Sequence, residues 1–254
     1  MLDKKSFSCV YCLNDIEKYC KMFFNSVLML RKYSNIPIKV IFIGSPSVKF
    51  VEFCSFYGVE IIEKKLIQDG SYFPINKKYI GELPGESLLF IDCDTFINGN
   101  VEKIFEFYSD YDFVACCNYW VYGFNYDNFY LKNSIKPFNS GVMLFNNGFQ
   151  NRIYEKFDEN YHEIKTKNNP LGKWLFESGN GWTIEEFTVS KCVADLEIKT
   201  NYFERNHCYN IRCPNDFRRI SESIIFHSYT KQWPEAYVRC NSPKKRYSLP
   251  FRKV

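Results

Sequence analysis

Two aspartates, at positions 92 and 94, are the residues of this sequence best placed to do chemistry. They follow the apolar run Leu88–Ile91 directly, and apolar residues come after them. A short unbroken apolar run predicts a strand buried on both faces, and ionised acids at its end are costly unless something pairs with them. Because residues two apart share a strand face, both carboxylates can converge on one hard cation, Mg²⁺ or Mn²⁺. The alternative interpretation is a strand followed by an acidic turn.

A histidine near the end of the chain is a candidate third ligand. His227 ends the apolar run Ile224–Phe226 much as Asp92 ends its own. Two carboxylates and one imidazole make a reasonable octahedral site for Mn²⁺, with positions left for phosphate oxygens and water. Lys231 follows shortly afterwards and could meet a diphosphate as a point charge. An ordinary surface lysine is the alternative.

The segments before Asp92 predict the sheet that must position it. Strand-like and helix-like patterns alternate over the first 62 residues, which argues for a parallel α/β sheet. The predicted strands are 6–13, 36–43 and 59–62, and the predicted helices are about 15–32 and 48–57. In such a sheet the ligand crevice lies at the carboxyl ends of the strands, where both aspartates would be.

The second half of the chain continues the pattern with more irregular stretches. Strands are predicted at 111–117, 138–146, 209–211 and 224–226, and helices at 101–107, 150–165 and 184–196, with a loop at 172–182. The aromatic-rich segment 118–137 reads either as a loop covering a site or as a satellite core cluster. No linker divides the chain, so we expect a single domain over residues 1–254.

The composition excludes several classes of protein. Hydrophobic residues make up 46% of the chain, enough for a packed core, and the net charge of +4 fits small anionic ligands and falls short of a nucleic-acid-binding signature. Eleven cysteines at irregular spacing do not form a structural zinc motif. We find no export signal and no transmembrane segment, so we expect a reducing, cytoplasmic location.

Four motifs, in order, resemble glycosyltransferase family 8, the glycogenin and bacterial galactosyltransferase group. They are LLFIDCDTFI, FNSGVMLFN, WTIEEF and IIFHSYTKQWP. The opening strand with Leu13-Asn14-Asp15 is also similar to that family's nucleotide-binding start, so the resemblance runs from about residue 7 to 235. It implies a GT-A fold, in which a nucleotide-binding half of about 1–117 joins a donor-sugar and acceptor half of about 118–254.

The resemblance also implies an activity. A metal-dependent hexosyltransferase would move a hexose from a nucleotide-diphosphate donor, commonly a UDP-sugar, to an acceptor hydroxyl with retention at the anomeric carbon. Mn²⁺ or Mg²⁺ would be held by Asp92, Asp94 and His227, with Asp92 also touching the donor. The donor would be contacted by Tyr11, Asn14, Tyr19, Lys78 (or its neighbour Lys77), Asn139, Ser140, Gly141 and Lys231. The acceptor, a glycan, protein or lipid, stays open, and a homo-oligomer is compatible with the sequence.

Two departures from the family pattern bear on the site. The family has an Asp-Gln pair where this chain has Glu185-Glu186, so a donor-sugar contact has changed. The closing segment His227–Pro234 lacks the family's glycine and has a shorter step to Lys231. A retaining reaction needs a carboxylate nucleophile or attack from the leaving-group side, and the two glutamates are the catalytic candidates alongside Asp92. The alternative is that the two glutamates only stabilise the helix, because negative charges are favourable in its first turn.

Three rival functions remain. A haloacid-dehalogenase-type phosphatase also begins with a strand and D-x-D, but its motif needs threonine two places after the second acid, where this chain has Phe96. A nucleotidyltransferase would want a glycine-rich basic loop after the first strand, and Cys12–Asp15 supplies none. A non-catalytic sugar-nucleotide or glycan-binding protein on the same fold is excluded only by an assay.

Overall fold

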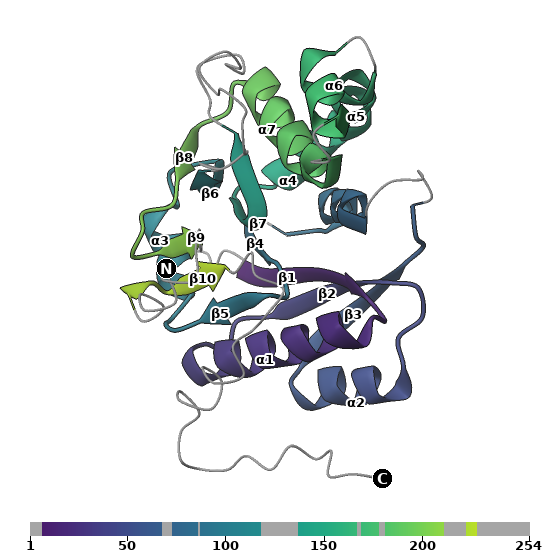
Figure 1. The fold of residues 1–254 in the computed structure, drawn as a ribbon. Coiled ribbons are helices and arrows are strands. Elements are labelled where there is room, and N and C mark those ends of the chain that lie inside the picture. Colours follow the sequence, from purple (N-terminus) through teal and green to yellow (C-terminus); the bar gives the residue numbers. More distant parts are fainter. Residues whose placement is uncertain are drawn as a thin grey trace.

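The fold is built on one large sheet. The computed structural model describes residues 7–67, 73–85, 87–117, 137–166, 169–177, 181–210 and 222–227. The sheet has seven strands in the order β3-β2-β1-β4-β7-β6-β8 (Figure 1). They are β1 (Phe7–Asn14), β2 (Ile38–Ile43), β3 (Val59–Lys64), β4 (Ser87–Ile91), β6 (Phe113–Cys117), β7 (Phe138–Phe145) and β8 (Thr200–Tyr202). Strands β1 to β4 are parallel and β7 is antiparallel to both its neighbours. The predicted α/β class is confirmed.

A second sheet of three short strands joins segments that are far apart in the chain. It consists of β5 (Thr95–Ile97), β10 (Ile225–His227) and β9 (Cys208–Asn210), in that spatial order. Strand β5 follows β4 after only three residues, so the chain passes from the large sheet to the small one through Asp92, Cys93 and Asp94. The small sheet therefore begins at the aspartates.

Helices cover both faces of the large sheet (Figure 1). One face carries α1 (Glu17–Tyr33), α2 (Val48–Phe56) and α3 (Glu102–Phe107). The other carries the 3₁₀ helices η1 (Phe73–Glu82) and η4 (Gly181–Thr183) with α4 (Phe149–Glu155), α5 (Phe157–Lys165), α6 (Pro170–Glu177) and α7 (Ile184–Leu196). In the described part of the chain no helix is both long and apolar enough to cross a membrane.

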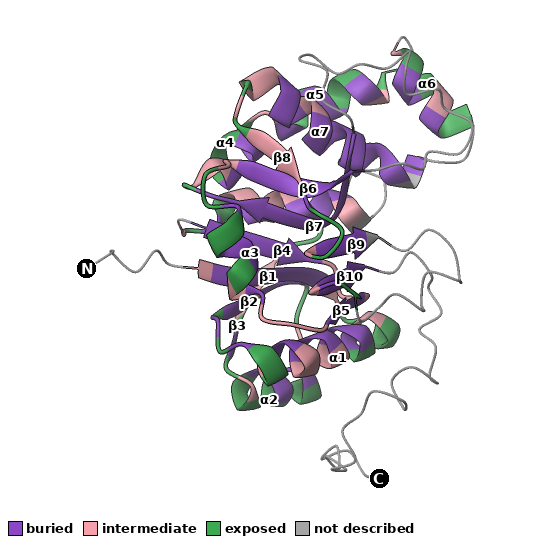
Figure 2. Ribbon diagram, turned by 90° about the vertical axis from the view of Figure 1, so that its left-hand side faces the viewer, coloured by how far each residue is buried: buried purple, intermediate pink, exposed green. Residues whose placement is uncertain are grey.

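Side-chain alternation along β4 explains why it is buried on both faces. Leu89 and Ile91 pack into the cluster beneath α1, whereas Leu88 and Phe90 pack into the cluster beneath α7. Successive strand residues point to opposite faces, and both faces of this strand meet helices, so an unbroken apolar run is required. Figure 2 shows the central strands as buried and the exposed residues largely on the outer sides of helices.

Two predicted elements differ from the structure. The helix predicted at 150–165 is two helices, α4 and α5, which meet at Lys156. Apolar side chains continue across the junction, at Tyr154 and Phe157, so their spacing hides the break. The loop predicted at 172–182 contains most of α6. Almost all of the aromatic segment 118–137 lies outside the described residues.

Candidate functional site

The D-x-D aspartates lie in a turn between two strands that belong to different sheets. The backbone N–H of Asp92 donates to the carbonyl of Gly141 at 2.7 Å, which extends the antiparallel pairing of β4 and β7 by one residue. Cys93 and Asp94 form the turn, and β5 starts at Thr95. The two acids therefore converge because the chain turns. The shared strand face expected from the sequence is not the cause, and the alternative of an acidic turn describes the backbone correctly.

Pairing within the small sheet brings His227 to these acids. Strand β10 runs antiparallel to β5, and His227 is the partner of Thr95, the residue after Asp94. The imidazole Nε2 lies 3.3 Å from Oδ1 of Asp94 and 3.7 Å from Oδ2 of Asp92. One potential ligand atom from each of the three residues lies within 4.8 Å of the others. A convergence predicted from strand ends is thus present, over a separation of more than 130 residues.

The electrostatics of these three residues suit a cation. Burial alone would lower the pKa of His227, but the carboxylates of Asp94 and Asp92 outweigh it and raise that pKa. Burial also raises the pKa of Asp92, and the positive charges of Lys77 and His227 oppose this. The histidine is buried whereas each aspartate keeps about a quarter of its side chain exposed, 27% and 25%. Two hard oxygens and one imidazole fit Mn²⁺ or Mg²⁺ and leave an open side for a ligand.

Gly141 makes room for the histidine. A Cβ built on Gly141 would overlap the imidazole ring of His227, so an alanine there must push the ring or β7 aside. We expect Gly141→Ala to weaken Mn²⁺ binding by about 10- to 100-fold, the range found when groups that orient metal ligands are changed. Calorimetric titration with Mn²⁺ measures the affinity. Gly58→Ala, in the turn between α2 and β3, is the control: its added Cβ meets no atom within 4 Å, but its φ of +61° strains an alanine, so it shows whether backbone strain alone weakens Mn²⁺ binding. Equal affinities in the two variants would contradict the role of Gly141.

Lys77 holds a second group of charges together behind the aspartates. Its ammonium donates to Oδ2 of Asp92 at 3.3 Å and to the carbonyl and hydroxyl of Ser140, both at 3.1 Å. The same ammonium forms an ion pair with Oδ1 of Asp92 at 3.1 Å. It also lies 3.7 Å from Glu185, whose Oε2 accepts the Ser140 hydroxyl at 2.5 Å. Burial alone would lower the pKa of Lys77, but the carboxylates of Asp92 and Glu185 raise it instead. The lysine is therefore charged and compensates two acids.

The structure chooses between the two adjacent lysines. Lys78 was predicted, ahead of Lys77, to contact the nucleotide-sugar donor. In the structure its side chain points to Asp158 on α5 and makes an exposed ion pair with both carboxylate oxygens at 3.0 Å. Its neighbour Lys77 enters the site. The difference between the two lysines follows from η1. Adjacent residues of a helix face different directions, and only the backbone phase decides which one turns inward.

Glu186 is held by a neighbouring contact. Asn139 donates its Nδ2 to Oε1 of Glu186 at 2.7 Å, and its Oδ1 accepts the backbone N–H of Gly141 at 3.1 Å. Both glutamates are buried although they stand in the first turn of α7. Burial, followed by the charge of Glu185, raises the pKa of Glu186 to about 8.

A pH dependence follows from the raised pKa of Glu186. The folded protein holds this proton up to about pH 8, whereas the ordinary value is 4.5. The contribution to stability is thus complete below pH 4.5 and is lost as the pH rises towards 8. As the pH rises in EDTA, the free energy of unfolding of wild type should therefore fall more steeply than that of Glu186→Gln. The difference between the two slopes should be up to about 1.4 kcal/mol per pH unit. Urea unfolding from pH 5 to 8 measures it, with exposed Glu52→Gln as control. Parallel wild-type and Glu186→Gln curves would contradict it.

Three residues of the first strand and helix occupy different positions. Tyr11 is fully buried and its hydroxyl contacts that of Ser26 at 3.0 Å, so the structure assigns Tyr11 to the core and not to the crevice wall. Asn14 is the last residue of β1, and its Oδ1 is buried with no hydrogen-bond partner among the described residues. Burial raises the pKa of Tyr19, and the neighbouring Cys93 and Asp94 add to this rise. Lys231 lies outside the described residues.

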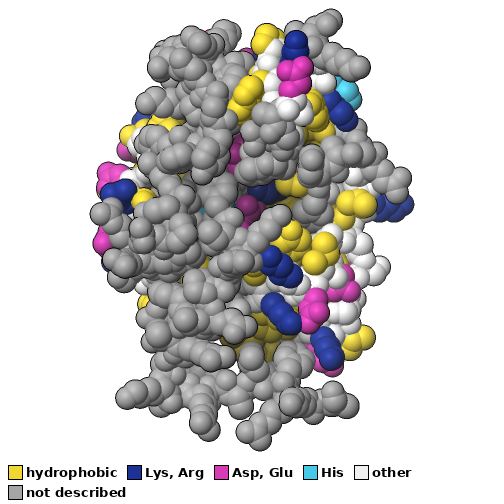
Figure 3. Space-filling model, viewed as in Figure 1, with side chains coloured by type: hydrophobic (Ala, Val, Ile, Leu, Met, Phe, Trp, Pro, Cys, Tyr) yellow, Lys and Arg dark blue, Asp and Glu magenta, His cyan; other side chains and the backbone are white. Residues whose placement is uncertain are grey.

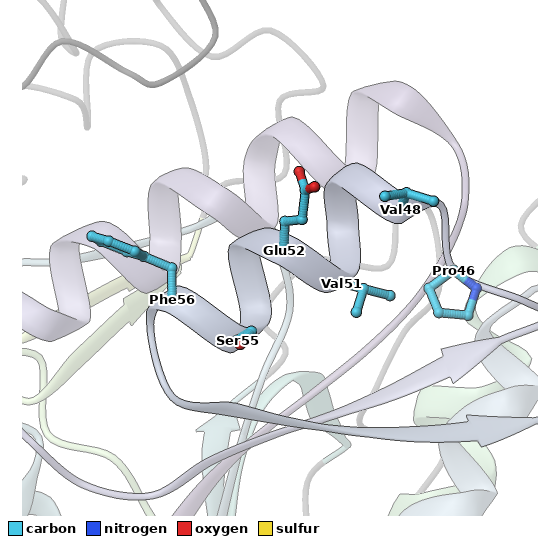
Figure 4. Close-up of a pocket in the computed structure, with 6 residues that line it drawn as sticks. All are labelled: Pro46, Val48, Val51, Glu52, Ser55 and Phe56. Atoms are coloured by element: carbon cyan, nitrogen blue, oxygen red, sulfur yellow. The ribbon is translucent and has the colours of Figure 1, made fainter.

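Charged side chains meet near the middle of one face of the molecule. In Figure 3 acidic and basic side chains lie side by side there. A separate hollow of about 540 Å³ lies along the outer side of α2 and is lined by Pro46, Val48, Val51, Glu52, Ser55 and Phe56 (Figure 4). It contains a single carboxylate and no group that the acid cluster uses. The candidate functional groups therefore lie at the end of β4, apart from this hollow.

Comparison with known proteins supports the fold. No protein-family model and no curated protein matches this chain. Among solved structures, the glycosyltransferase GlyE of Streptococcus pneumoniae TIGR4 matches 87% of the chain at 16% identity and a TM-score of 0.57, and the chain spans 54% of GlyE.

Two further solved structures match along nearly their whole length. The galactosyltransferase LgtC, solved with donor and acceptor sugar analogues, matches 88% of this chain and 87% of its own at 13% identity and a TM-score of 0.54. Mouse xyloside xylosyltransferase 1 matches 90% of this chain and 99% of its own at 11% identity and a TM-score of 0.54. The predicted GT-A fold is confirmed: this chain is folded like these glycosyltransferases.

Proposed function

We propose that this protein is a metal-dependent glycosyltransferase that moves a hexose from a UDP-sugar to an acceptor hydroxyl. The observation that carries the proposal is the convergence of Asp92, Asp94 and His227 at the carboxyl end of β4, within a GT-A fold. Ligands bind at this edge of open α/β sheets. The donor set is one that Mn²⁺ accepts, with an open side where a diphosphate would lie.

The transfer reaction explains why such a site is needed. As the bond between the sugar and the diphosphate breaks, negative charge grows on the leaving oxygens. Mn²⁺ held by the three ligands would act as the Lewis acid that stabilises this charge. Lys77 adds a positive charge in the same crevice and, by pairing with Asp92, holds that ligand in place.

Polar groups around the aspartates suit a nucleotide sugar. The unpartnered Oδ1 of Asn14 is an acceptor that a base N–H would satisfy, and satisfying a buried polar atom is favourable. Likewise Oε1 of Glu185 is buried with no hydrogen-bond partner among the described residues, and a sugar hydroxyl would satisfy it. Glu185 would thus orient the donor sugar. A neutral Glu186 would be a poor nucleophile, so with retention we favour attack from the leaving-group side, with Glu186 shielding the sugar.

Thermal unfolding with a panel of nucleoside diphosphates, each with and without Mn²⁺, tests the proposal. Ligand that binds only the folded state raises the unfolding midpoint by mass action. We expect a rise with UDP that requires Mn²⁺, followed by hydrolysis of one UDP-sugar in a sugar-by-sugar screen. No rise with any nucleotide would overturn the proposal. A rise with UDP but no turnover of any sugar would favour a non-catalytic sugar-nucleotide-binding protein.

A further inference from the structure

Two cysteine thiols from different sheets lie against each other. Sγ of Cys116 is 3.1 Å from Sγ of Cys208, and both residues are buried, 5% and 3% exposed. Cys116 belongs to β6 of the large sheet, and Cys208 is the first residue of β9 in the small sheet. Both are free thiols. Among the described residues, this is the one pair of cysteines with a contact between their sulfur atoms.

The backbone around both residues allows the sulfurs to move closer. A disulfide bond is about 2.05 Å long, so closure requires an approach of about 1 Å. The pairing of β6 with β7 shifts its register between Ala115 and Cys116, a local irregularity of the kind that bends a strand. Strand β9 is three residues long and, among the described residues, pairs with β10 alone. The ladder is thus irregular at Cys116, whereas Cys208 is paired regularly with Ile225 but on one side only.

We propose that Cys116 and Cys208 form a redox-sensitive pair that closes to a disulfide and cross-links the two sheets. With hydrogen peroxide as oxidant, one thiolate attacks a peroxide oxygen, the O–O bond breaks, and a sulfenic acid and one water form. The second thiol then attacks that sulfur, the S–S bond forms, and a second water leaves. Two thiols lose two electrons and two protons, and the peroxide gains both. A dithiol reductant reverses the step by exchange.

The cross-link would fasten the strand that supports the metal-site histidine. Ile225 is the partner of Cys208 in the β9–β10 pairing, and His227 is the partner of Asn210 two residues on. Tying β9 to β6 therefore limits how far β10 can move from the large sheet. The bond also joins positions 92 residues apart, and long closed loops restrict the unfolded chain most. The oxidised form should therefore resist heat better than the reduced form.

Burial controls the rate of closure. Burial, together with the neighbouring Cys116 thiol, raises the pKa of Cys208, so its reactive thiolate is scarce at neutral pH. In a reducing compartment the pair stays as two thiols, and closure requires exposure to an oxidant. This inference concerns the thiols alone and does not depend on the proposed transferase activity.

Peptide mapping of the full-length protein tests the proposal. Native wild type is treated with hydrogen peroxide, free thiols are alkylated in denaturant, and the digest is analysed by mass spectrometry before and after reduction. We expect a linked peptide pair containing Cys116 and Cys208 that disappears with dithiothreitol. We also expect a higher unfolding midpoint, by several degrees, in oxidised than in reduced wild type. Cys208→Ser should lose both effects.

Two control variants keep the result interpretable. Cys117→Ser removes the adjacent thiol and should leave the link and the midpoint rise intact. Cys54→Ser removes another buried thiol, on α2, and should do the same. Because the peptide map is made on wild type, a folding defect in Cys208→Ser does not affect it. Absence of the 116–208 link, or its replacement by a link from Cys208 to Cys117 or Cys213, would overturn the proposal.

Discussion

Asp94→Asn is expected to abolish metal-dependent binding of the sugar donor and to lower the rate of sugar transfer by at least about 100-fold. Changing a group that only orients a metal ligand already lowers metal affinity or activity by about 10- to 100-fold. Asparagine keeps the size of the side chain but removes the charge that faces His227 at 3.3 Å. The side chain is a quarter exposed, so the variant should fold. The measurement is UDP release from the UDP-sugar identified by screening, as a function of Mn²⁺ concentration.

An aspartate at the other edge of the sheet provides the matched control. Asp110 is exposed and precedes β6, whose amino end lies opposite the carboxyl end of β4 because the two strands run in the same direction. Asp110→Asn removes the same charge from the protein and should leave turnover and its Mn²⁺ dependence unchanged. If both variants turned over at the wild-type rate, Asp94 would not be a metal ligand in the reaction.

Lys77→Met is expected to destabilise the metal-free protein by about 3–5 kcal/mol, the usual cost of removing one partner from a buried ion pair. Methionine keeps the apolar stem but removes the ammonium, which lies 5.0 Å from the centre of the Phe90 ring. The carboxylates of Asp92 and Glu185 then lose their compensating charge. Urea unfolding at pH 7 in EDTA measures the loss. Sugar transfer should also be lost, because Asp92 is no longer held.

The adjacent lysine is the control for this change. Lys78→Met removes an exposed pair with Asp158, and exposed pairs contribute about 0–1 kcal/mol. Adding Glu185→Gln to Lys77→Met should recover part of the stability, because one of the two uncompensated charges disappears. Equal losses from the Lys77 and Lys78 variants would show that the buried network does not stabilise the fold.

Acid should partly rescue Lys77→Met. Burial raises the pKa values of Asp92 and Glu185, and Lys77 opposes this in both cases, so its removal raises them further. Carboxyls with a raised pKa in the folded state favour folding below their unfolded pKa and cost stability as the pH rises through the folded value. The difference between variant and wild type should therefore narrow as the pH falls towards 5. A constant difference from pH 5 to 8 would contradict this account.

Local sequence patterns predicted where the two acids and the histidine of the candidate site lie. An apolar run that ends in Asp92 predicts a buried strand with its acids at the ligand edge, and the structure has that strand. The end of the run at His227 predicted another ligand, and the imidazole lies beside the acids. In both cases the local sequence indicates a buried strand and the point where it ends. A strand covered on both faces tolerates no polar residue until it ends.

Other residues of the site depended on contacts that local patterns do not contain. The sequence could not separate Lys77 from Lys78, because the phase of η1 is set by packing against α4 and the sheet. It could not show that Tyr11 faces α1 with its hydroxyl on Ser26, since one residue of register exchanges the two faces of a strand. Nor could it show that Asn139 and Ser140 hold the two glutamates of α7.

The sequence by itself determined the α/β class, the strand that delivers the two aspartates and the identity of the three candidate metal ligands. Only the tertiary structure decided how they meet, through a turn into a second sheet whose strand β10 comes from the far end of the chain. It also decided which lysine is buried and which thiols touch. Local periodicity reports burial, whereas these outcomes depend on pairing between segments about 90 to 130 residues apart or on helix phase, which the packed fold alone sets.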